Sequence, residues 1–196
     1  AVDGRRHVER RRRLALAVSF AALALTLVLV GQFDSANPGI QFVERHAWIP
    51  TLNVEYFVGV DGLSLALLLL TAIVTPMALL ASRGITEKPQ LYYALILFLQ
   101  SGLFGAFTAL NFFHWFLYWE LTLIPAFFLV KFWGGPQRHG ASLQFFIYTM
   151  VGSIAMLLAC LAVYQATGTF DLIVLAEKGR TGELASAMLV KIGWYG

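Results

Sequence analysis

Five long apolar runs occupy most of this chain, and they restrict its fold more than any other feature. An α-helix rises about 1.5 Å per residue, so about 20 apolar residues cross the hydrocarbon core of a bilayer. The runs lie at about 14–30, 58–82, 91–110, 112–133 and 142–165. They predict an all-α, polytopic bundle of about five transmembrane helices.

The composition supports a membrane protein and argues against several kinds of site. Only 13% of the 196 residues are charged, whereas a soluble domain has about 25%. Lys and Arg lie at the ends of the apolar runs without aromatic interleaving, which argues against nucleic-acid binding. Cys160 is the only cysteine, which excludes an internal disulfide. The four histidines lack metal-ligand spacing and no glycine-rich nucleotide motif occurs, so we expect no metal or cofactor in this chain.

Charge divides the chain into a basic N-terminal segment, residues 1–13, a helix bundle, residues 14–166, and a polar tail, residues 167–196. If each run spans once, most Lys and Arg fall on the side of the N-terminus. The loop 31–57, on the other side, carries only Arg45. The positive-inside rule then places the N-terminus in the cytoplasm. A cleaved secretory signal is an alternative interpretation of the first run, although no A-x-A motif follows it.

Residues typical of helix ends flank the runs. Asp61 can cap the second helix, and Pro89 can open the third. Gly134-Gly135-Pro136 can end the fourth helix, and Gly168 follows the fifth. Two pairs of small residues four positions apart allow neighbouring helices to pack closely: Ser101 with Gly105, and Ala155 with Ala159.

Glu120 lies near the middle of the fourth run, with no other acid for about ten residues on either side. An ionised carboxylate at the centre of a bilayer costs roughly 2.5–3.5 kcal/mol on insertion scales, so an intramembrane acid is usually functional. Thr122 faces away from Glu120 on a helix, and Leu117 and Leu123 share its face. A partner must therefore come from another helix. We predict that Glu120 is a proton relay, with a purely structural, hydroxyl-bonded glutamate as the alternative.

Three further residues of the fourth run bear on this prediction. Lys131 lies eleven residues beyond Glu120, on the same helix face and about 16 Å away. It could relay protons, or reach the cytoplasmic headgroups. His114 begins the run at the opposite side, as a proton uptake point or an interfacial histidine. Pro125 removes one backbone hydrogen bond near Glu120, which could admit water or could be a tolerated membrane proline.

Aromatic residues of the fourth run could hold a quinone, although such residues are more typical of packing and of membrane interfaces. They are Trp115, Tyr118, Trp119 and Trp133.

Several motifs together resemble one family, the antiporter-like subunits of respiratory complex I, and most closely its subunit M (chain 4) branch. They are Val60-Asp-Gly-Leu-Ser64, Tyr118-Trp-Glu-Leu-Thr-Leu-Ile-Pro-Ala-Phe-Phe-Leu-Val130, Trp133-Gly-Gly135, Phe145-Phe-Ile-Tyr-Thr149, Gly152-Ser153 and Thr167-Gly-Thr-Phe170. The similarity covers about residues 59–172 well and the first run loosely.

The resemblance implies a proton-pumping membrane subunit driven by redox chemistry elsewhere in the complex. It implies NADH, FMN, iron–sulfur clusters and quinone in partner subunits, adjacent antiporter-like subunits as partners, and the bacterial inner (plasma) membrane as location. Glu120 takes the place of the family's key glutamate, which pairs with a lysine on a broken helix. Lys191, in Leu189-Val-Lys-Ile-Gly-Trp-Tyr-Gly196, takes the place of a later lysine and is a second relay candidate.

The chain departs from the family pattern between Phe170 and Lys191. The family's broken helix and its proline-rich motif belong there, but only about twenty residues separate the two positions. The resemblance therefore implies a truncated or internally deleted member, with a tail that joins a remnant of a later helix. Two alternatives stay open. One is a subunit of a related cation/proton antiporter or membrane-bound hydrogenase complex, and the other is a non-transporting scaffold.

Overall fold

A computed structural model of the chain describes residues 2–52 and 54–183. Its elements follow one another as α1 (Val2–Gln32), β1 (Gln41–Ile49), η1 (Pro50–Leu52), β2 (Val54–Val60), α2 (Gly62–Ala81), η2 (Ser82–Gly84), α3 (Pro89–Thr108), α4 (Phe112–Trp133), α5 (Arg138–Thr167) and α6 (Leu172–Thr181). Five described helices are long and apolar enough to cross a membrane, which confirms the all-α, polytopic prediction.

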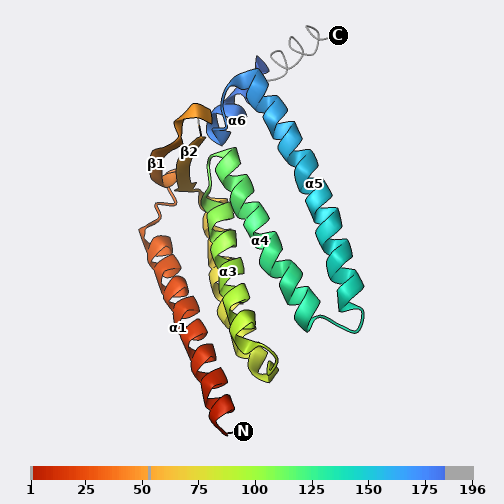
Figure 1. Cartoon of the computed structure of the whole chain (residues 1–196). Helices are drawn as coiled ribbons and strands as arrows, with labels where there is room; N and C mark the ends of the chain where they lie inside the picture. The colour runs from red at the N-terminus through yellow and green to blue at the C-terminus, as the bar shows by residue number, and fades with distance from the viewer. Residues whose placement is uncertain (1, 53, 184–196) are drawn as a thin grey trace.

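Helices α1 to α5 run side by side, and the β1–β2 hairpin and α6 lie together at the end of the bundle opposite the N-terminus (Figure 1). Each helix from α1 to α5 packs against the next one in sequence, and α1 also contacts α3. Buried apolar side chains form two small clusters, one around Leu79 and Tyr93 and one around Val54 and Phe170. Many large apolar side chains stay exposed, as expected where lipid or further protein covers the helices.

The helix ends form at the predicted residues. The carboxylate of Asp61 accepts the Ser64 N–H at 2.7 Å and caps α2. Pro89 lies in the first turn of α3, and α4 ends at Trp133 with Gly134 as its cap. Gly168 adopts φ +73° after α5, a left-handed conformation that glycine reaches without the steric cost of a side chain.

A β-hairpin replaces the expected plain loop, and the first three residues of the second apolar run, which was expected from about residue 58, belong to its second strand. Residues 54–60 form β2, which pairs antiparallel with β1, and α2 begins only at Gly62. A residue far away in the sequence also holds this strand, because the Leu110 N–H donates to the Phe57 carbonyl at 2.8 Å. Apolar residues 58–60 read as helix by hydropathy alone, and only this pairing assigns them to a strand.

Glycines bring α3 and α4 close together. A Cβ at Gly102 would lie 2.8 Å from Cγ2 of Thr122, and a Cβ at Gly105 would overlap the ring of Tyr118. The predicted small-residue contact therefore forms at Gly105, but its second member is Gly102 rather than the exposed Ser101. The other predicted pair, Ala155 and Ala159, is exposed in the described part of the chain.

Candidate proton-transfer site

Helix α4 carries Glu120 into the apolar part of the bundle. The helix begins at a well-formed cap, because the side-chain oxygen of Asn111 accepts the N–H groups of Phe113 at 3.1 Å and His114 at 3.3 Å. Glu120 lies nine residues after Asn111, which is about 13 Å along the helix axis. The helix continues for thirteen residues more, so Glu120 lies well inside the span.

The carboxylate of Glu120 is half-buried, and its Oε1 atom is fully covered without a hydrogen-bond partner among the described residues. Thr122 does not supply one, because its hydroxyl donates to the Trp119 carbonyl at 2.7 Å. Buried polar atoms in proteins are almost always paired, so an unpaired carboxylate oxygen is a place for a donor, a cation or a proton.

Pro125 is fully buried inside α4 and contributes no N–H. The carbonyl that this N–H would have met belongs to Leu121, four residues earlier and next to Glu120. The Leu121 carbonyl therefore lacks its usual helix donor, one residue along the chain from Glu120. Carboxylate and carbonyl together can hold water or a protonated partner.

Lys131 lies in the last turn of α4, where its charge favours the negative end of the helix dipole. Its Nζ atom is 5.2 Å from the centre of the Phe127 ring. No ion pair joins it to Glu120 within residues 2–52 and 54–183, as the predicted separation of about 16 Å requires. Its role as a relay stays a prediction. Lys191 lies outside the described residues.

His114 lies at the start of α4, but the hairpin covers it and leaves it only 4% exposed. Its ring centre is 4.9 Å from those of Tyr56 and Tyr118 and 6.2 Å from that of Trp48. The ring bonds the backbone of Phe57, and Nδ1 has no partner in the part of the chain that the structure describes. Among the described residues, no hydrogen bond joins the side chains of His114 and Glu120. The role of His114 in proton uptake therefore also stays a prediction.

The aromatic residues of α4 do not gather into one site. Trp115 and Trp119 stack on each other at 5.4 Å, and Tyr118 packs toward Gly105 and His114. Trp133 lies at the far end of the helix, where its ring nitrogen donates to the Glu87 carbonyl at 3.0 Å. Nothing in this arrangement favours a quinone pocket built from these four rings.

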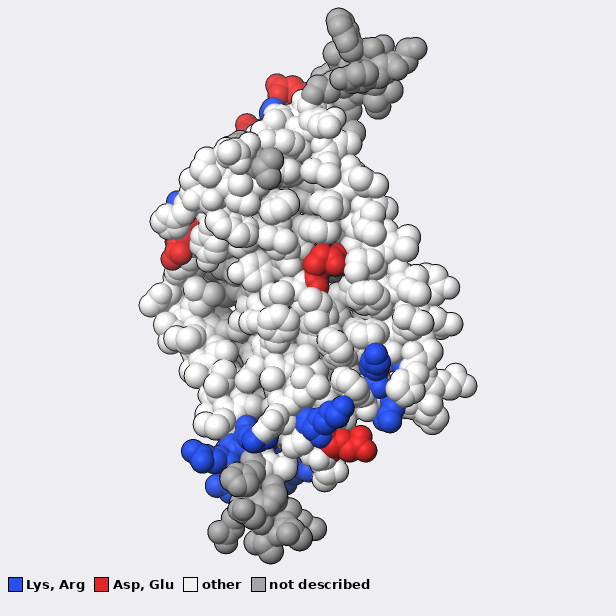
Figure 2. Space-filling model, in the orientation of Figure 1, with Lys and Arg blue, Asp and Glu red and all other residues white. Residues whose placement is uncertain are grey.

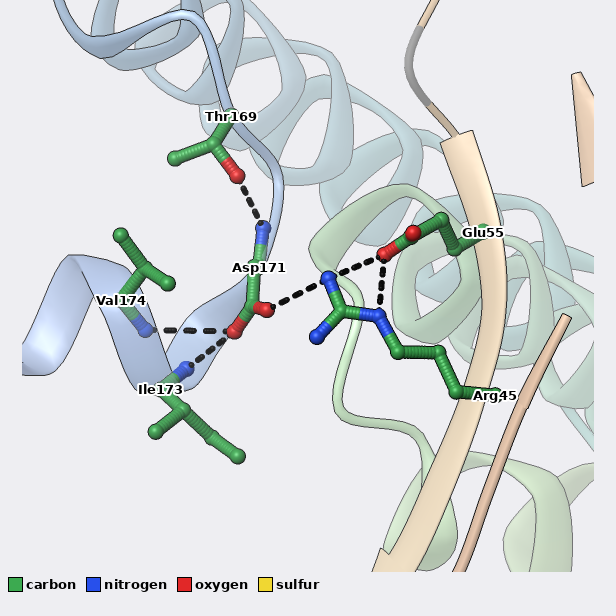
Figure 3. Close-up of polar contacts among 6 residues, drawn as sticks. All are labelled: Arg45, Glu55, Thr169, Asp171, Ile173 and Val174. Atoms are coloured by element: carbon green, nitrogen blue, oxygen red, sulfur yellow. Dashed lines mark hydrogen bonds and ion pairs between the residues drawn. The ribbon is translucent and has the colours of Figure 1, made fainter. Parts of the chain in front are cut away.

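An ionic cluster at the hairpin end, drawn in Figure 3, was not predicted from the sequence. The guanidinium of Arg45 in β1 lies 2.5 Å from Glu55 of β2 and 3.0 Å from Asp171, the cap of α6. The hydrogen bond to Glu55 raises the pKa of Arg45, with smaller contributions from Asp171. Asp171 is only 3% exposed. Nothing in the sequence indicates that a single Arg and a single Asp so far apart in the chain will pair.

Charged side chains are more frequent at the two ends of the molecule than in its middle. Figure 2 shows Lys and Arg gathered at the lower end, where α1 begins, and a broad white band above them that holds an isolated acidic side chain. The chain order places the loops after α2 and α4 at this same end. The basic residues of those loops and of the helix ends beside them are Arg83, Lys88, Lys131 and Arg138.

Two family models match the chain, one after the other. The model described as NADH-ubiquinone oxidoreductase chain 4, amino terminus, matches residues 14–106. The model described as NADH:quinone oxidoreductase/Mrp antiporter, TM, matches residues 109–194.

Curated relatives carry names from several oxidoreductases. F(420)H(2) dehydrogenase subunit M of Methanosarcina mazei is 46% identical over 79% of this chain and 32% of its own length. NAD(P)H-quinone oxidoreductase chain 4 1 of Nostoc sp. is 39% identical over 85% of this chain and 32% of its own length. NADH-quinone oxidoreductase subunit M of Rhodobacter capsulatus is 35% identical over 93% of this chain and 34% of its own length. The chain spans about a third of the length of these relatives.

Solved structures share the fold. A chain of respiratory complex I from Thermus thermophilus with bound NADH superposes with a TM-score of 0.72 at 28% identity, over 82% of this chain and 33% of that one. A chain of the Mrp complex from Dietzia sp. DQ12-45-1b has a TM-score of 0.66 at 22% identity, over 91% of this chain and 22% of that one. The matched segments, the identities and the five-helix bundle agree: the chain belongs to the family of antiporter-like subunits of NADH-quinone oxidoreductase, in its subunit M (chain 4) branch.

Proposed function

We propose that this chain conducts protons across a membrane as part of a multi-subunit NADH-quinone oxidoreductase, with Glu120 as a relay. The observation that carries the proposal is the buried Oε1 atom of Glu120, which has no partner among the described residues and lies inside a helix long enough to span. A carboxylate in that position is stable when it holds a proton or when a cation approaches it. Movement of the cation then releases or draws in the proton.

The redox chemistry belongs to partner subunits in this proposal. NADH, FMN, iron–sulfur clusters and quinone would be bound there, and this chain would contribute no redox group. The partners would be neighbouring membrane subunits, including other antiporter-like ones. The concentration of Lys and Arg at the α1 end supports a cytoplasmic N-terminus in a bacterial inner (plasma) membrane.

The direct test is Glu120→Gln in the intact complex, reconstituted into proteoliposomes. The amide keeps the size and hydrogen bonding of the carboxyl but cannot carry a proton. We expect proton translocation and coupled quinone reduction to fall at least tenfold, while Glu120→Asp keeps a measurable part of the activity. Wild-type rates in Glu120→Gln would overturn the relay. A loss of assembled complex with unchanged turnover per complex would instead indicate a scaffold.

A second candidate is a subunit of a related complex that uses another electron donor or exchanges another cation. It is favoured by the 46% identity to a subunit named F(420)H(2) dehydrogenase subunit M and by the fold shared with the Mrp complex. Assays of the purified complex with NADH and with reduced deazaflavin, each with and without Na⁺, separate the candidates. Turnover with NADH that does not require Na⁺ supports the first proposal.

A further inference from the structure

A cleft opens between the hairpin and the first turns of α4. Its volume is about 410 Å³, and it is lined by Trp48, Tyr56, His114, Leu117, Tyr118 and Leu121. Sites for small molecules and single headgroups have about 300–1,000 Å³ and a mostly apolar lining with few polar groups. Glu120 is not among its lining residues.

His114 is the polar group of this cleft, and its chemistry restricts the occupant. The backbone of Phe57 acts on the ring as a hydrogen-bond acceptor, and because Nδ1 has no partner within the described residues, the hydrogen is assigned to the other nitrogen, Nε2. Nδ1 is then a bare acceptor, fully covered and without a partner within the described residues. An occupant that satisfies Nδ1 must donate a hydrogen bond. The carbonyl oxygens of a quinone only accept, so they cannot do so.

The other lining groups favour a positive charge on that donor. Three aromatic rings, those of Trp48, Tyr56 and Tyr118, surround His114, and ring faces attract ammonium groups. Burial raises the pKa of Tyr56, and the nearby Tyr118 and the Glu44 carboxylate raise it further. Glu44 therefore adds negative charge near Tyr56, one of the residues that line the cleft.

The position of the cleft indicates that an occupant with a cationic headgroup also has an apolar tail. His114 lies in the first turn of α4, at the hairpin end of a helix long enough to span, and hence at headgroup level. Leu117 and Leu121 follow one and two turns further into the span. We propose that the cleft binds a phospholipid with a primary ammonium headgroup, of the phosphatidylethanolamine class, through Nδ1 of His114 and the aromatic rings. The proposal does not depend on proton transfer by Glu120.

Lipid titration of the delipidated complex tests this inference. Phosphatidylethanolamine, phosphatidylcholine and phosphatidylglycerol with identical acyl chains are added, and bound lipid is counted by native mass spectrometry. Phosphatidylcholine keeps the cation but has no N–H, whereas phosphatidylglycerol has no cation and donates only from its neutral hydroxyls. We expect phosphatidylethanolamine to bind about 10-fold more tightly than either phosphatidylcholine or phosphatidylglycerol, because only its headgroup combines a donor with a cation.

His114→Phe keeps the ring and removes the acceptor, so it should lower phosphatidylethanolamine binding to the phosphatidylcholine level and leave phosphatidylcholine unchanged. Trp48→Ala, at a residue that is 50% exposed, should weaken both lipids about 3-fold. His139→Phe is the matched control, since His139 is exposed in the first turn of α5 and is not among the residues that line the cleft.

Equal affinity for all three lipids in the wild type, or an ethanolamine preference that survives both His114→Phe and Trp48→Ala, would overturn the proposal. Free phosphoethanolamine is a competitor in a separate arm. Displacement of the lipid by millimolar phosphoethanolamine would show that the cleft takes the soluble headgroup instead and would overturn the lipid assignment.

Discussion

The guanidinium of Arg45 lies 3.0 Å from the carboxylate of Asp171, across 126 positions of sequence. Asp171 is buried, and its Oδ1 atom also accepts the N–H groups of Ile173 and Val174. The same carboxylate therefore caps α6 and ties it to the hairpin (Figure 3). Next to it, the Leu172 N–H donates to the Leu110 carbonyl and the Phe112 N–H to the Phe170 carbonyl, so the start of α4 belongs to the same assembly.

Removal of Arg45 should loosen this assembly. Arg45→Met leaves Asp171 buried with its cap bonds but without its counter-charge, and we expect a loss of about 1–3 kcal/mol in stability. Faster hydrogen exchange of the amides at 172–175 in the purified complex would show the effect locally. Arg83→Met is the control, because Arg83 is exposed at the opposite end, and it should change stability by less than about 0.5 kcal/mol. Unchanged exchange in Arg45→Met would mean that the pair contributes nothing to the docking of α6.

The cap of α2 should depend on pH. The hydrogen bond from the Ser64 backbone holds the pKa of Asp61 below its ordinary value of 3.8. A lowered pKa means that the folded state favours the ionised form, so the stabilisation is fully present above pH 3.8 and is lost as the pH falls through the lowered value. Asp61→Ala should therefore cost about 1 kcal/mol at pH 7 and progressively less below pH 3.8. Thermal midpoints of both proteins across that range provide the measurement, and a constant difference at every pH would contradict it.

Close contact between α3 and α4 makes Gly105 intolerant of a side chain. Gly105→Ala would push a methyl group into the Tyr118 ring, and we expect a loss of about 1–3 kcal/mol or a lower yield of assembled complex. Gly152→Ala is the matched change within a helix, since nothing lies within 4 Å of a Cβ at Gly152. It should be neutral or stabilising by up to about 1 kcal/mol. Equal behaviour of the two variants would contradict the packing of these helices.

Lys131 allows its two proposed roles to be separated by one substitution. Arginine keeps the positive charge, the contact with the Phe127 ring and the reach to lipid headgroups, but it does not release its proton. We expect Lys131→Arg to keep proton translocation within about twofold of the wild type, as an interfacial anchor would. A fall of tenfold or more, comparable to that expected for Glu120→Gln, would identify Lys131 as a relay instead.

Local signals in the sequence predicted much of this fold. Hydropathy located the five long helices, and Asp61, Pro89, Gly134 and Gly168 marked their ends, because span length and helix caps depend on residues close together in the chain. Glu120 stood out for the same reason, since an acid within an apolar run is visible without any knowledge of its neighbours.

Contacts between distant residues were not predictable in this way. Hydropathy assigned residues 58–60 to a helix, but they pair with β1 and receive a bond from Leu110. The position of His114 near one end of its helix was predictable, but not that the hairpin covers its ring. Gly102, rather than Ser101, meets Thr122, because the rotation of α3 about its axis is set by packing against α4.

The amino-acid sequence by itself therefore determined that the described part of this chain holds five helices long and apolar enough to cross a membrane, which residues cap several of their ends, and that Glu120 lies within one of them. Only the tertiary structure decided which groups meet at the hairpin end: Arg45 with Asp171, and His114 with the rings of the cleft. The reason is physical. The free energies of membrane insertion and of helix capping depend on one segment and its solvent. An ion pair such as Arg45 with Asp171, or a cleft, exists only when segments far apart in the chain are brought together.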